Sequence, residues 1–174
     1  DQDTVQDIND DENAEQEGFD EIDDFQDEED DLVVHGEKIQ IEKNDRSLSE
    51  LHRWYQKGRL VVDPEWQRKY VWDDKRASRL IESFLLELPI PVIYLSQTEE
   101  QEYEVIDGLQ RLTSVFKFFD GDLRLSRLQM LSEYNGKFFK DLDQRTQNRL
   151  EDITLRTFEL DKSTSKDMLF IIFE

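Results

Sequence analysis

The sequence has no cysteine, and it contains only two histidines and three prolines. The absence of cysteine excludes a disulfide framework, a thiolate zinc site and a cysteine nucleophile. His35 and His52 have no companion at metal-ligand spacing, which argues against a histidine-based metal site. A leader segment and a membrane-spanning run of roughly 18 apolar residues are also missing. We therefore expect a cytoplasmic protein that has no membrane partner.

Acidic residues are unevenly distributed in the chain, whose formal net charge is -21. Residues 1–31 contain 11 Asp and 6 Glu but no Lys or Arg, so they contribute -17. The other 26 acidic and 22 basic residues nearly balance, at -4. Because apolar residues are scarce in the first stretch, we predict a disordered acidic tail over 1–31 and one domain over 32–174. The tail is a solubilising segment, an arm that docks on a partner through Phe19, Ile22 and Phe25, or a mimic of nucleic acid over a basic cleft.

Capping and breaking signals divide the domain into short strands and helices. Ser47 and Glu50 form a capping-box pattern ahead of a helical apolar stripe, and Gly58 is placed to end that helix. Asp73 begins the clearest helix, whose apolar stripe continues to Leu88. Strands are expected at 32–41, 59–62, 91–95, 103–106, 123–125 and 155–160, the third and fourth as a hairpin, and helices after Gly108 and from Thr164, with a helix or loop around 142–153.

Basic and aromatic residues gather on either side of Asp73. The segment E-W-Q-R-K-Y-V-W at 65–72 contains Gln67 and Arg68. An arginine in such a loop can bind phosphate, stack on a base or pack its stem on a tryptophan. Trp72 and its aromatic neighbours are interpreted as core or rim packing. The polar side of the following helix is interpreted as a solvated face, and it carries Lys75, Arg76, Arg79 and Glu82.

The stretch V-I-D-G-L-Q-R-L-T at 105–113 is the strongest candidate for chemistry, because it predicts a strand, a sharp turn and a helix start. Gly108 can adopt a positive φ, and the free amides of the following helix favour an anion. Arg111 offers a planar fork for phosphate, Asp107 can hold magnesium or orient a water, and Gln110 can position an attacking water. Together these groups fit a triphosphate site. In the alternative interpretation, Asp107 only caps the helix and Arg111 pairs with a surface acid.

Three segments resemble the N-terminal domain of GmrSD-type restriction proteins: P-E-W-Q-R-K-Y-V-W, R-L-I-E-S-F-L-L-E-L-P-I-P-V-I-Y-L and Y-E-V-I-D-G-L-Q-R-L-T-S-V-F. The similarity extends from about Leu48 to the final I-I-F-E, where the chain stops within a segment typical of the family, so we expect a domain truncated at its C-terminal end. The family is marked by an Asp-Gly-Gln-Gln-Arg signature, which corresponds here to Asp107, Gly108, Leu109, Gln110 and Arg111. An upstream Gln-Arg pair of the family corresponds to Gln67 and Arg68.

The resemblance implies a ParB/sulfiredoxin-like α+β domain, with a small mixed sheet and flanking helices, that binds and hydrolyses a nucleoside triphosphate with Mg²⁺. It implies that such a domain regulates DNA cleavage by a C-terminal HNH-type nuclease domain, in modification-dependent restriction and phage defence. DNA is accordingly an expected partner of the full-length protein. The implied roles are catalysis by Asp107 and Gln110, metal binding by Asp107, and nucleotide contacts by Gln67, Arg68, Gly108 and Arg111.

Leu109 departs from the signature, since it stands where the family usually has its first glutamine. If this side chain contacted nucleotide or water, turnover would be weakened, whereas a position facing the core would change nothing. Its place beside Leu112 and Val115 favours the core.

Other functions stay open on the sequence. One alternative is a module that binds DNA or a partner protein without turnover, through the Arg68 loop and the face of Arg76 and Arg79. Another is direct nicking of nucleic acid, for which only Asp107 is a suitable metal carboxylate. The oligomeric state is also open, and a homo-oligomer is one of its possibilities.

Overall fold

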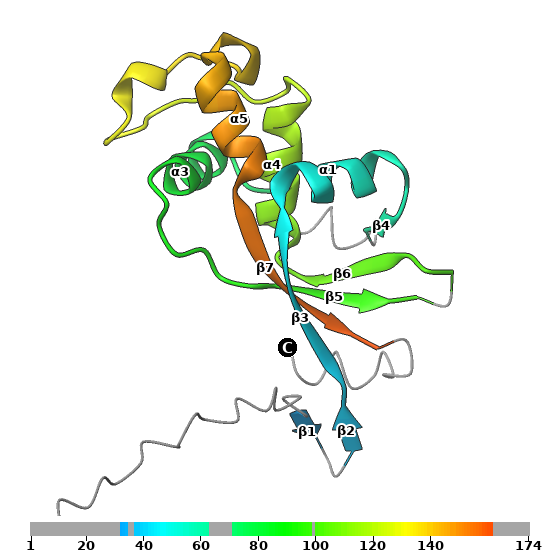
Figure 1. The fold of residues 1–174 in the computed structure, drawn as a ribbon. Helices are drawn as coiled ribbons and strands as arrows, with labels where there is room; N and C mark the ends of the chain where they lie inside the picture. Colours follow the sequence, from blue (N-terminus) through cyan, green and yellow to red (C-terminus); the bar gives the residue numbers. More distant parts are fainter. Residues whose placement is uncertain (1–31, 35–36, 63–70, 99, 162–174) are drawn as a thin grey trace, which may run out of the picture.

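The described part of the chain forms a mixed β-sheet with helices packed on one side of it (Figure 1). In this computed structural model the described residues are 32–34, 37–62, 71–98 and 100–161. The strands are β1 (Leu32–Val34), β2 (Glu37–Ile39), β3 (Ile41–Ser47), β4 (Leu60–Val61), β5 (Ile93–Gln97), β6 (Tyr103–Asp107) and β7 (Thr154–Leu160). The helices are α1 (Leu48–Gln56), α3 (Asp74–Leu85), α4 (Leu109–Phe119) and α5 (Gln144–Asp152), with 3₁₀ turns η1 (Ser132–Tyr134) and η2 (Phe139–Asp141). The predicted α+β class is confirmed.

The main sheet has the strand order β3-β7-β5-β6-β4. Its β3–β7 and β5–β6 pairs are antiparallel, whereas its β5–β7 and β4–β6 pairs are parallel. The hairpin expected of the strands around 91–95 and 103–106 is confirmed. Its register places Asp107, the last residue of β6, opposite Tyr94 near the start of β5. The signature therefore begins where the two central strands meet the helices.

The N-terminal strand prediction is only partly correct. Instead of one strand over 32–41, β1 and β2 pair as an antiparallel hairpin, and β3 begins at Ile41. β3 continues to Ser47, and all seven of its residues pair with β7. The polar sequence of β3 conceals this strand, because pairing with a strand more than a hundred residues away in the chain supplies its stabilisation.

Two helices begin where the capping patterns predict. The Ser47 hydroxyl accepts a bond from the amide of Glu50 at 3.1 Å at the start of α1. The Asp73 carboxylate accepts one from the amide of Arg76 at 2.8 Å at the start of α3. The carboxylate of Glu50 binds Arg46 instead of completing a capping box. The stretch around 142–153, left open by the sequence, contains the helix α5.

α3 differs from the prediction at its end and on one side. It ends at Leu85, and Glu87 takes a left-handed backbone conformation with φ 56°. Leu88 is therefore not part of the buried stripe, and it is 52% exposed. Glu82, predicted to be solvated, is buried. Its Oε2 accepts bonds from the amides of residues 130 and 131 at 3.1 and 3.0 Å, which offset the cost of burying a carboxylate.

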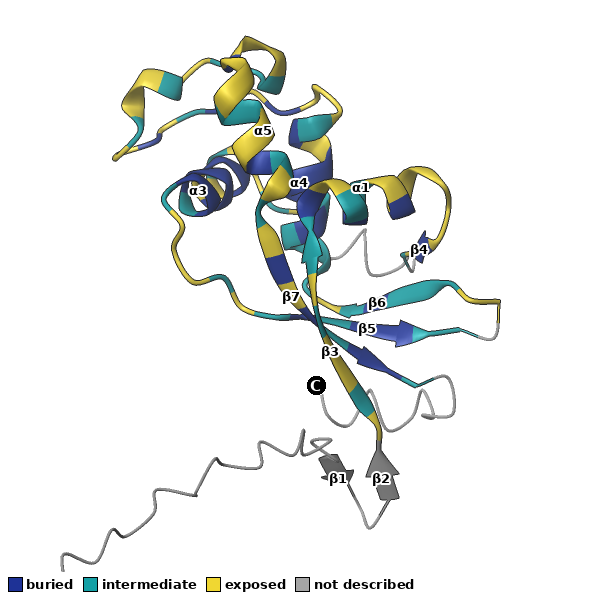
Figure 2. Ribbon diagram, in the orientation of Figure 1, coloured by how far each residue is buried: buried dark blue, intermediate teal, exposed yellow. Residues whose placement is uncertain are grey.

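Apolar side chains from the helices and from one side of the sheet form a single core (Figure 2). Leu123 and Leu125 are buried in it, but the strand predicted over 123–125 is wrong. Only Leu125 makes ladder-like backbone bonds in this stretch, one to Lys137 and one from Gly136. Burial of alternate leucines thus arises here from an anchored loop.

Two predicted segments, the acidic tail over 1–31 and the helix from Thr164, lie outside the described residues. Within the described residues, no helix is both long and apolar enough to cross a membrane.

Candidate functional site

Gly108 connects β6 to α4 in a conformation that favours glycine. Its φ is +99° and its ψ is 14°, so the predicted positive φ is confirmed. A Cβ at this position would overlap Cδ1 of Ile93, on the neighbouring strand. Both the backbone and the packing therefore require glycine, and the turn brings the main chain of α4 close against β5.

The first turn of α4 offers backbone amides without a cap. The first helical bond joins the amide of Leu112 to the carbonyl of Gly108 at 3.1 Å, and no side chain caps the helix. The amides of residues 109–111 thus precede that bond, where a helix has its free donors and the positive end of its dipole. Of the alternative interpretation, the cap by Asp107 is wrong, whereas Arg111 does pair with an exposed acid, which is Asp107 itself.

Arg111 is held next to Asp107 by the main chain of the β5 region. Its Nη2 donates to the carbonyl oxygen of Val92 at 3.0 Å and lies 3.6 Å from Oδ2 of Asp107. The arginine side chain is mostly buried, whereas that of Asp107 is 52% exposed. The buried Nε of Arg111 has no hydrogen-bond partner among the described residues. The guanidinium is therefore fixed in place, and its ionic partner belongs to the signature itself.

Gln110 links the signature to the chain that precedes α3. Its Oε1 accepts a bond from the amide of Trp72 at 3.0 Å. Trp72 itself is half-buried and packs against the core, as predicted for packing rather than for a base platform. The candidates Gln67 and Arg68 lie outside the described residues.

The described residues that flank Gln67 and Arg68 in the sequence, Val62 and Val71, lie near α4. Val62, on one end, lines a pocket together with Leu109, and Val71, on the other, lines a different pocket together with Gln110. Val62 and Val71 thus both lie beside the first turns of α4.

Leu109 packs against the core, which confirms the preferred prediction for this position. It also lines the pocket shared with Val62, on the side of α4 away from Arg111. The departure from the family signature therefore leaves the contacts of Asp107 and Arg111 unaltered.

A magnesium ion has one carboxylate to bind at this turn. No group of three or more His, Cys, Asp or Glu side chains suited to a metal occurs in the part of the chain that the structure describes. Magnesium often uses one or two carboxylates, with waters and substrate phosphates as its other ligands. The exposed Asp107 fits that mode of binding, which depends on a phosphate ligand, and does not fit an all-protein cage.

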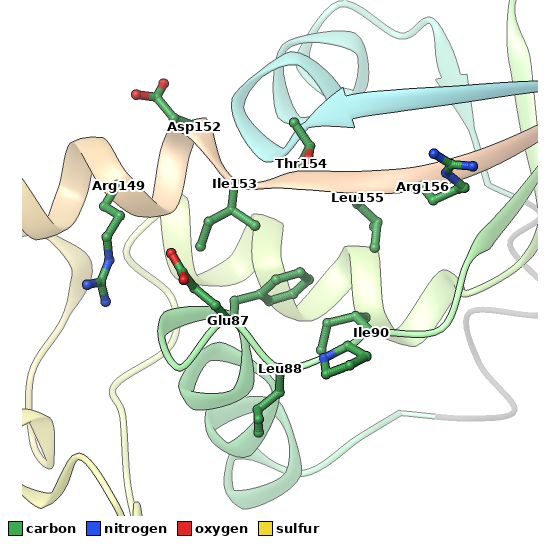
Figure 3. A pocket seen from close by; sticks show the side chains of 11 residues that line it. Glu87, Leu88, Ile90, Arg149, Asp152, Ile153, Thr154, Leu155 and Arg156 are labelled. Carbon is green, nitrogen blue, oxygen red and sulfur yellow. The ribbon is translucent and has the colours of Figure 1, made fainter. Parts of the chain in front are cut away.

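A larger hollow, of about 560 Å³, lies between the end of α3, the linker to β5 and the α5–β7 junction (Figure 3). Ile153 and Glu87 face this hollow in Figure 3, while Arg149 reaches down along one side. Nη2 of Arg149 donates to the carbonyl of Leu85 at 2.7 Å and so satisfies the end of α3. None of the described signature residues lines the hollow. It follows from the way α3 ends and is separate from the candidate site.

One protein family matches well over half of the chain. The family described as GmrSD restriction endonuclease, N-terminal domain, matches residues 48–174. The chain belongs to this family. The GmrSD N-terminal region begins at the first residue of α1, yet β3, which precedes it, completes the sheet by pairing with β7. Comparisons with curated proteins and with solved structures found no match.

Three contacts of this GmrSD domain have no local signal in the sequence: the carbonyl of Val92, the amide of Trp72 and the side chain of Ile93. The first two are backbone groups, which residue identity does not reveal. The third depends on the β5–β6 register. Each becomes visible only once the sheet and α4 are assembled.

Proposed function

We propose that this chain is the nucleotide-binding regulatory domain of a modification-dependent restriction or phage-defence protein, and that it binds and hydrolyses a nucleoside triphosphate with Mg²⁺. The observation that carries the proposal is the uncapped start of α4, which combines free amides with a fixed arginine and an exposed aspartate. Free helix amides and a guanidinium are both suited to phosphate oxygens. Membership of the GmrSD family supports the link to restriction.

Each signature residue has a proposed role that follows from its contacts. Gly108 turns the chain through a positive φ into α4 and has no side chain of its own, so phosphates can approach the backbone at the start of the helix. Arg111 neutralises phosphate charge from a position set by Val92. Asp107, exposed at the end of β6, holds the metal or orients a water. Bound magnesium would supply electrostatic stabilisation of phosphate oxygens.

Gln110 acts as a positioning residue and, in this proposal, also orients the attacking water. Its Oε1 is engaged with Trp72, which leaves the amide nitrogen without a hydrogen bond among the described residues. That nitrogen is the group available to a water. The same bond fixes Trp72, which follows Gln67 and Arg68 by a few residues in the sequence, against α4, and we propose these two residues as a second set of nucleotide contacts.

The test compares triphosphate binding and turnover in the wild type, Asp107→Ala, Arg111→Ala and Arg111→Lys. We expect each substitution to lower turnover by about 100-fold or more, a typical loss for one removed electrostatic contact in an active site. Arg111→Lys keeps the charge but loses the planar fork, so it separates charge from geometry. Arg79→Ala, on the exposed side of α3, is the matched control. Full activity in folded Asp107→Ala and Arg111→Ala proteins would refute the assignment.

A DNA- or protein-binding module without turnover is the second candidate. Arg76 and Arg79 are exposed, and within the described residues neither takes part in an ion pair. The Arg76 guanidinium lies 4.6 Å from the ring centroid of Trp72, near the segment that carries Arg68. DNA binding by a chain that lacks residues 1–31 should then weaken steeply with salt. Binding that is independent of salt, or absent, would argue against this candidate.

A further inference from the structure

A pocket of about 240 Å³ lies beside the signature, between α1, β4, β6 and α4. Its walls combine apolar side chains, among them Leu60, Val105 and Leu109, with an almost equal share of polar surface. The ring of Tyr55 stacks on that of Phe116, with centroids 4.8 Å apart, at its edge. The volume is below the range of about 300–1,000 Å³ that is typical for drug-sized ligands. The pocket is therefore suited to one flat ring system rather than to a whole nucleotide.

The pocket is adjacent to the proposed phosphate site, because Leu109, the residue after Gly108, belongs to both. Leu109 has its amide at the start of α4 and its side chain in the pocket wall. Thr113, Phe116 and Asp120 continue the lining along the same side of the helix. At about 1.5 Å per residue, the distance along the axis from Leu109 to Phe116 is about 10 Å. Arg111 lies on the other side of α4, so the ligand would cross the end of the helix: its phosphates would lie on the free amides of the first turn beside Arg111, and its ring would lie in the pocket.

The charges at the rim exclude the reverse orientation. Asp120 and Asp122 provide two carboxylates against one ammonium, that of Lys117. Oδ1 of Asp120 lies 2.8 Å from Nε2 of His52, so this carboxylate already has a partner. Phosphate would be repelled by such a rim. Carboxylates accept hydrogen bonds from an exocyclic amino group, whereas the N3–H of uracil lies between two carbonyl oxygens that a carboxylate repels.

We propose that this pocket binds the base of the nucleoside triphosphate and that it selects bases with an exocyclic amino group, such as adenine, over uracil. The inference rests on the triphosphate site proposed above and names its base subsite. Leu109 packs against the core, and the part of its side chain that lines the pocket then contacts the base and not the phosphates. Stacking on an aromatic or apolar wall strengthens binding of a base by about tenfold or more.

Binding of ATP, UTP and inorganic triphosphate to the full chain, each with Mg²⁺, tests the proposal. We expect ATP to bind about tenfold or more tightly than inorganic triphosphate, and more tightly than UTP. Thr113→Phe, which fills the pocket, should weaken ATP about tenfold and leave inorganic triphosphate unchanged. Equal affinities for ATP and inorganic triphosphate in the wild type, or equal weakening of both ligands by Thr113→Phe, would overturn the base subsite while leaving the phosphate site intact. Failure of all three ligands to bind would overturn the triphosphate site and the subsite together.

A second variant covers the case in which Thr113→Phe does not fold. Asp122→Asn is an exposed, isosteric change and should bring the affinity ratio of ATP to UTP toward one, with the affinity for inorganic triphosphate unaltered. Glu133→Gln, an exposed acid in η1, is the matched control for the lost charge. An unchanged ratio in Asp122→Asn would contradict the proposed recognition of the amino edge.

Discussion

At position 108, both the local sequence and the packing of a distant residue require glycine. The Asp-Gly pair predicts a turn with positive φ from two adjacent letters, and the structure has that turn. The overlap that a side chain would make with Ile93 could not be predicted, because Ile93 reaches this position through the β5–β6 register. Arg111 shows the same division: its residue type suggests a phosphate ligand, but its anchor, the carbonyl of Val92, comes from the tertiary fold.

Gly108→Ala should therefore destabilise the protein through two effects. A left-handed conformation costs a residue with a Cβ about 1–2 kcal/mol. Relieving the overlap with Ile93 adds an overpacking cost of about 1–3 kcal/mol. The expected loss in the free energy of unfolding is about 3 kcal/mol, measured by urea denaturation. Gly121→Ala is the control, since Gly121 has φ +83° and nothing lies within 4 Å of the position that a Cβ would occupy there. Equal losses in the two variants would show that Ile93 moves aside freely.

Three helices end in the same way, although only two of the ends could be predicted. In each, an amide bonds to the carbonyl five residues earlier, with a left-handed residue between helix and linker. The left-handed residues are Gly58 after α1, Glu87 after α3 and Gly121 after α4. Glycine indicates such an end, whereas glutamate does not. The apolar Leu88 therefore extends the predicted helix beyond the point where the real one stops.

Glu87→Gly should stabilise the protein. Replacing a left-handed glutamate removes a strain of about 1–2 kcal/mol, and the extra freedom of glycine in the unfolded chain offsets about half of it. We expect a gain of about 0.5–1 kcal/mol in the free energy of unfolding, measured by urea denaturation. Arg79→Gly, at an exposed position in the interior of α3, should instead lose about 1 kcal/mol. A loss of stability in Glu87→Gly would mean that its side chain contributes more than its backbone costs.

The cap of α5 should make stability depend on pH. The Asp143 carboxylate accepts a bond from the amide of Thr146 at 2.7 Å, and this bond lowers the pKa of Asp143 below its ordinary value of 3.8. A lowered pKa in the folded state means that the stabilisation is present above pH 3.8 and is lost as the pH falls through and below that value. Asp143→Asn keeps the oxygen but not the charge, so wild type and variant should differ at about pH 6 and converge in acid.

The control for this cap lies at the opposite end of the same helix. Asp152 stands at the C-terminus of α5, where a negative charge opposes the helix dipole. Asp152→Asn should therefore not destabilise the protein at about pH 6. Thermal unfolding of both variants between about pH 2.5 and pH 7 is the measurement, and an Asp143→Asn difference that does not depend on pH would contradict the assignment.

The order of the sheet could not be predicted from the sequence. Local patterns indicate most strands, and the β5–β6 hairpin follows from their proximity in the chain. The pairing of β3 with β7 is different, because it joins Ile41 to Leu160 and Ser47 to Thr154 across the whole domain. Nothing in the polar sequence of β3 indicates its partner. This pairing nevertheless holds the segment before the family match against the central strands.

Two ion pairs join β3 to β7, and we expect the more buried pair to contribute more to the free energy of unfolding. Arg46 Nη2 lies 2.7 Å from Glu159 Oε1, with side chains only 22% and 4% exposed. Arg156 Nε lies 3.1 Å from Asp45 Oδ1, with side chains 51% and 54% exposed. Glu159 also accepts bonds from Asn44 and Thr157, so neutralising it would disturb several buried donors at once.

Glu159→Gln should accordingly lower the free energy of unfolding by about 2 kcal/mol or more, because it leaves a largely buried arginine with only part of its ionic partners. Asp45→Asn, the same chemical change on the exposed pair, should cost less than about 1 kcal/mol. Salt provides a second distinction, since about 0.5 M NaCl should remove most of the Asp45→Asn effect and little of the Glu159→Gln effect. Urea denaturation of both variants at two salt concentrations measures this. A cost for Glu159→Gln as small as that expected for Asp45→Asn would mean that the buried charges contribute little, and that the β3–β7 pairing depends mainly on its backbone ladder.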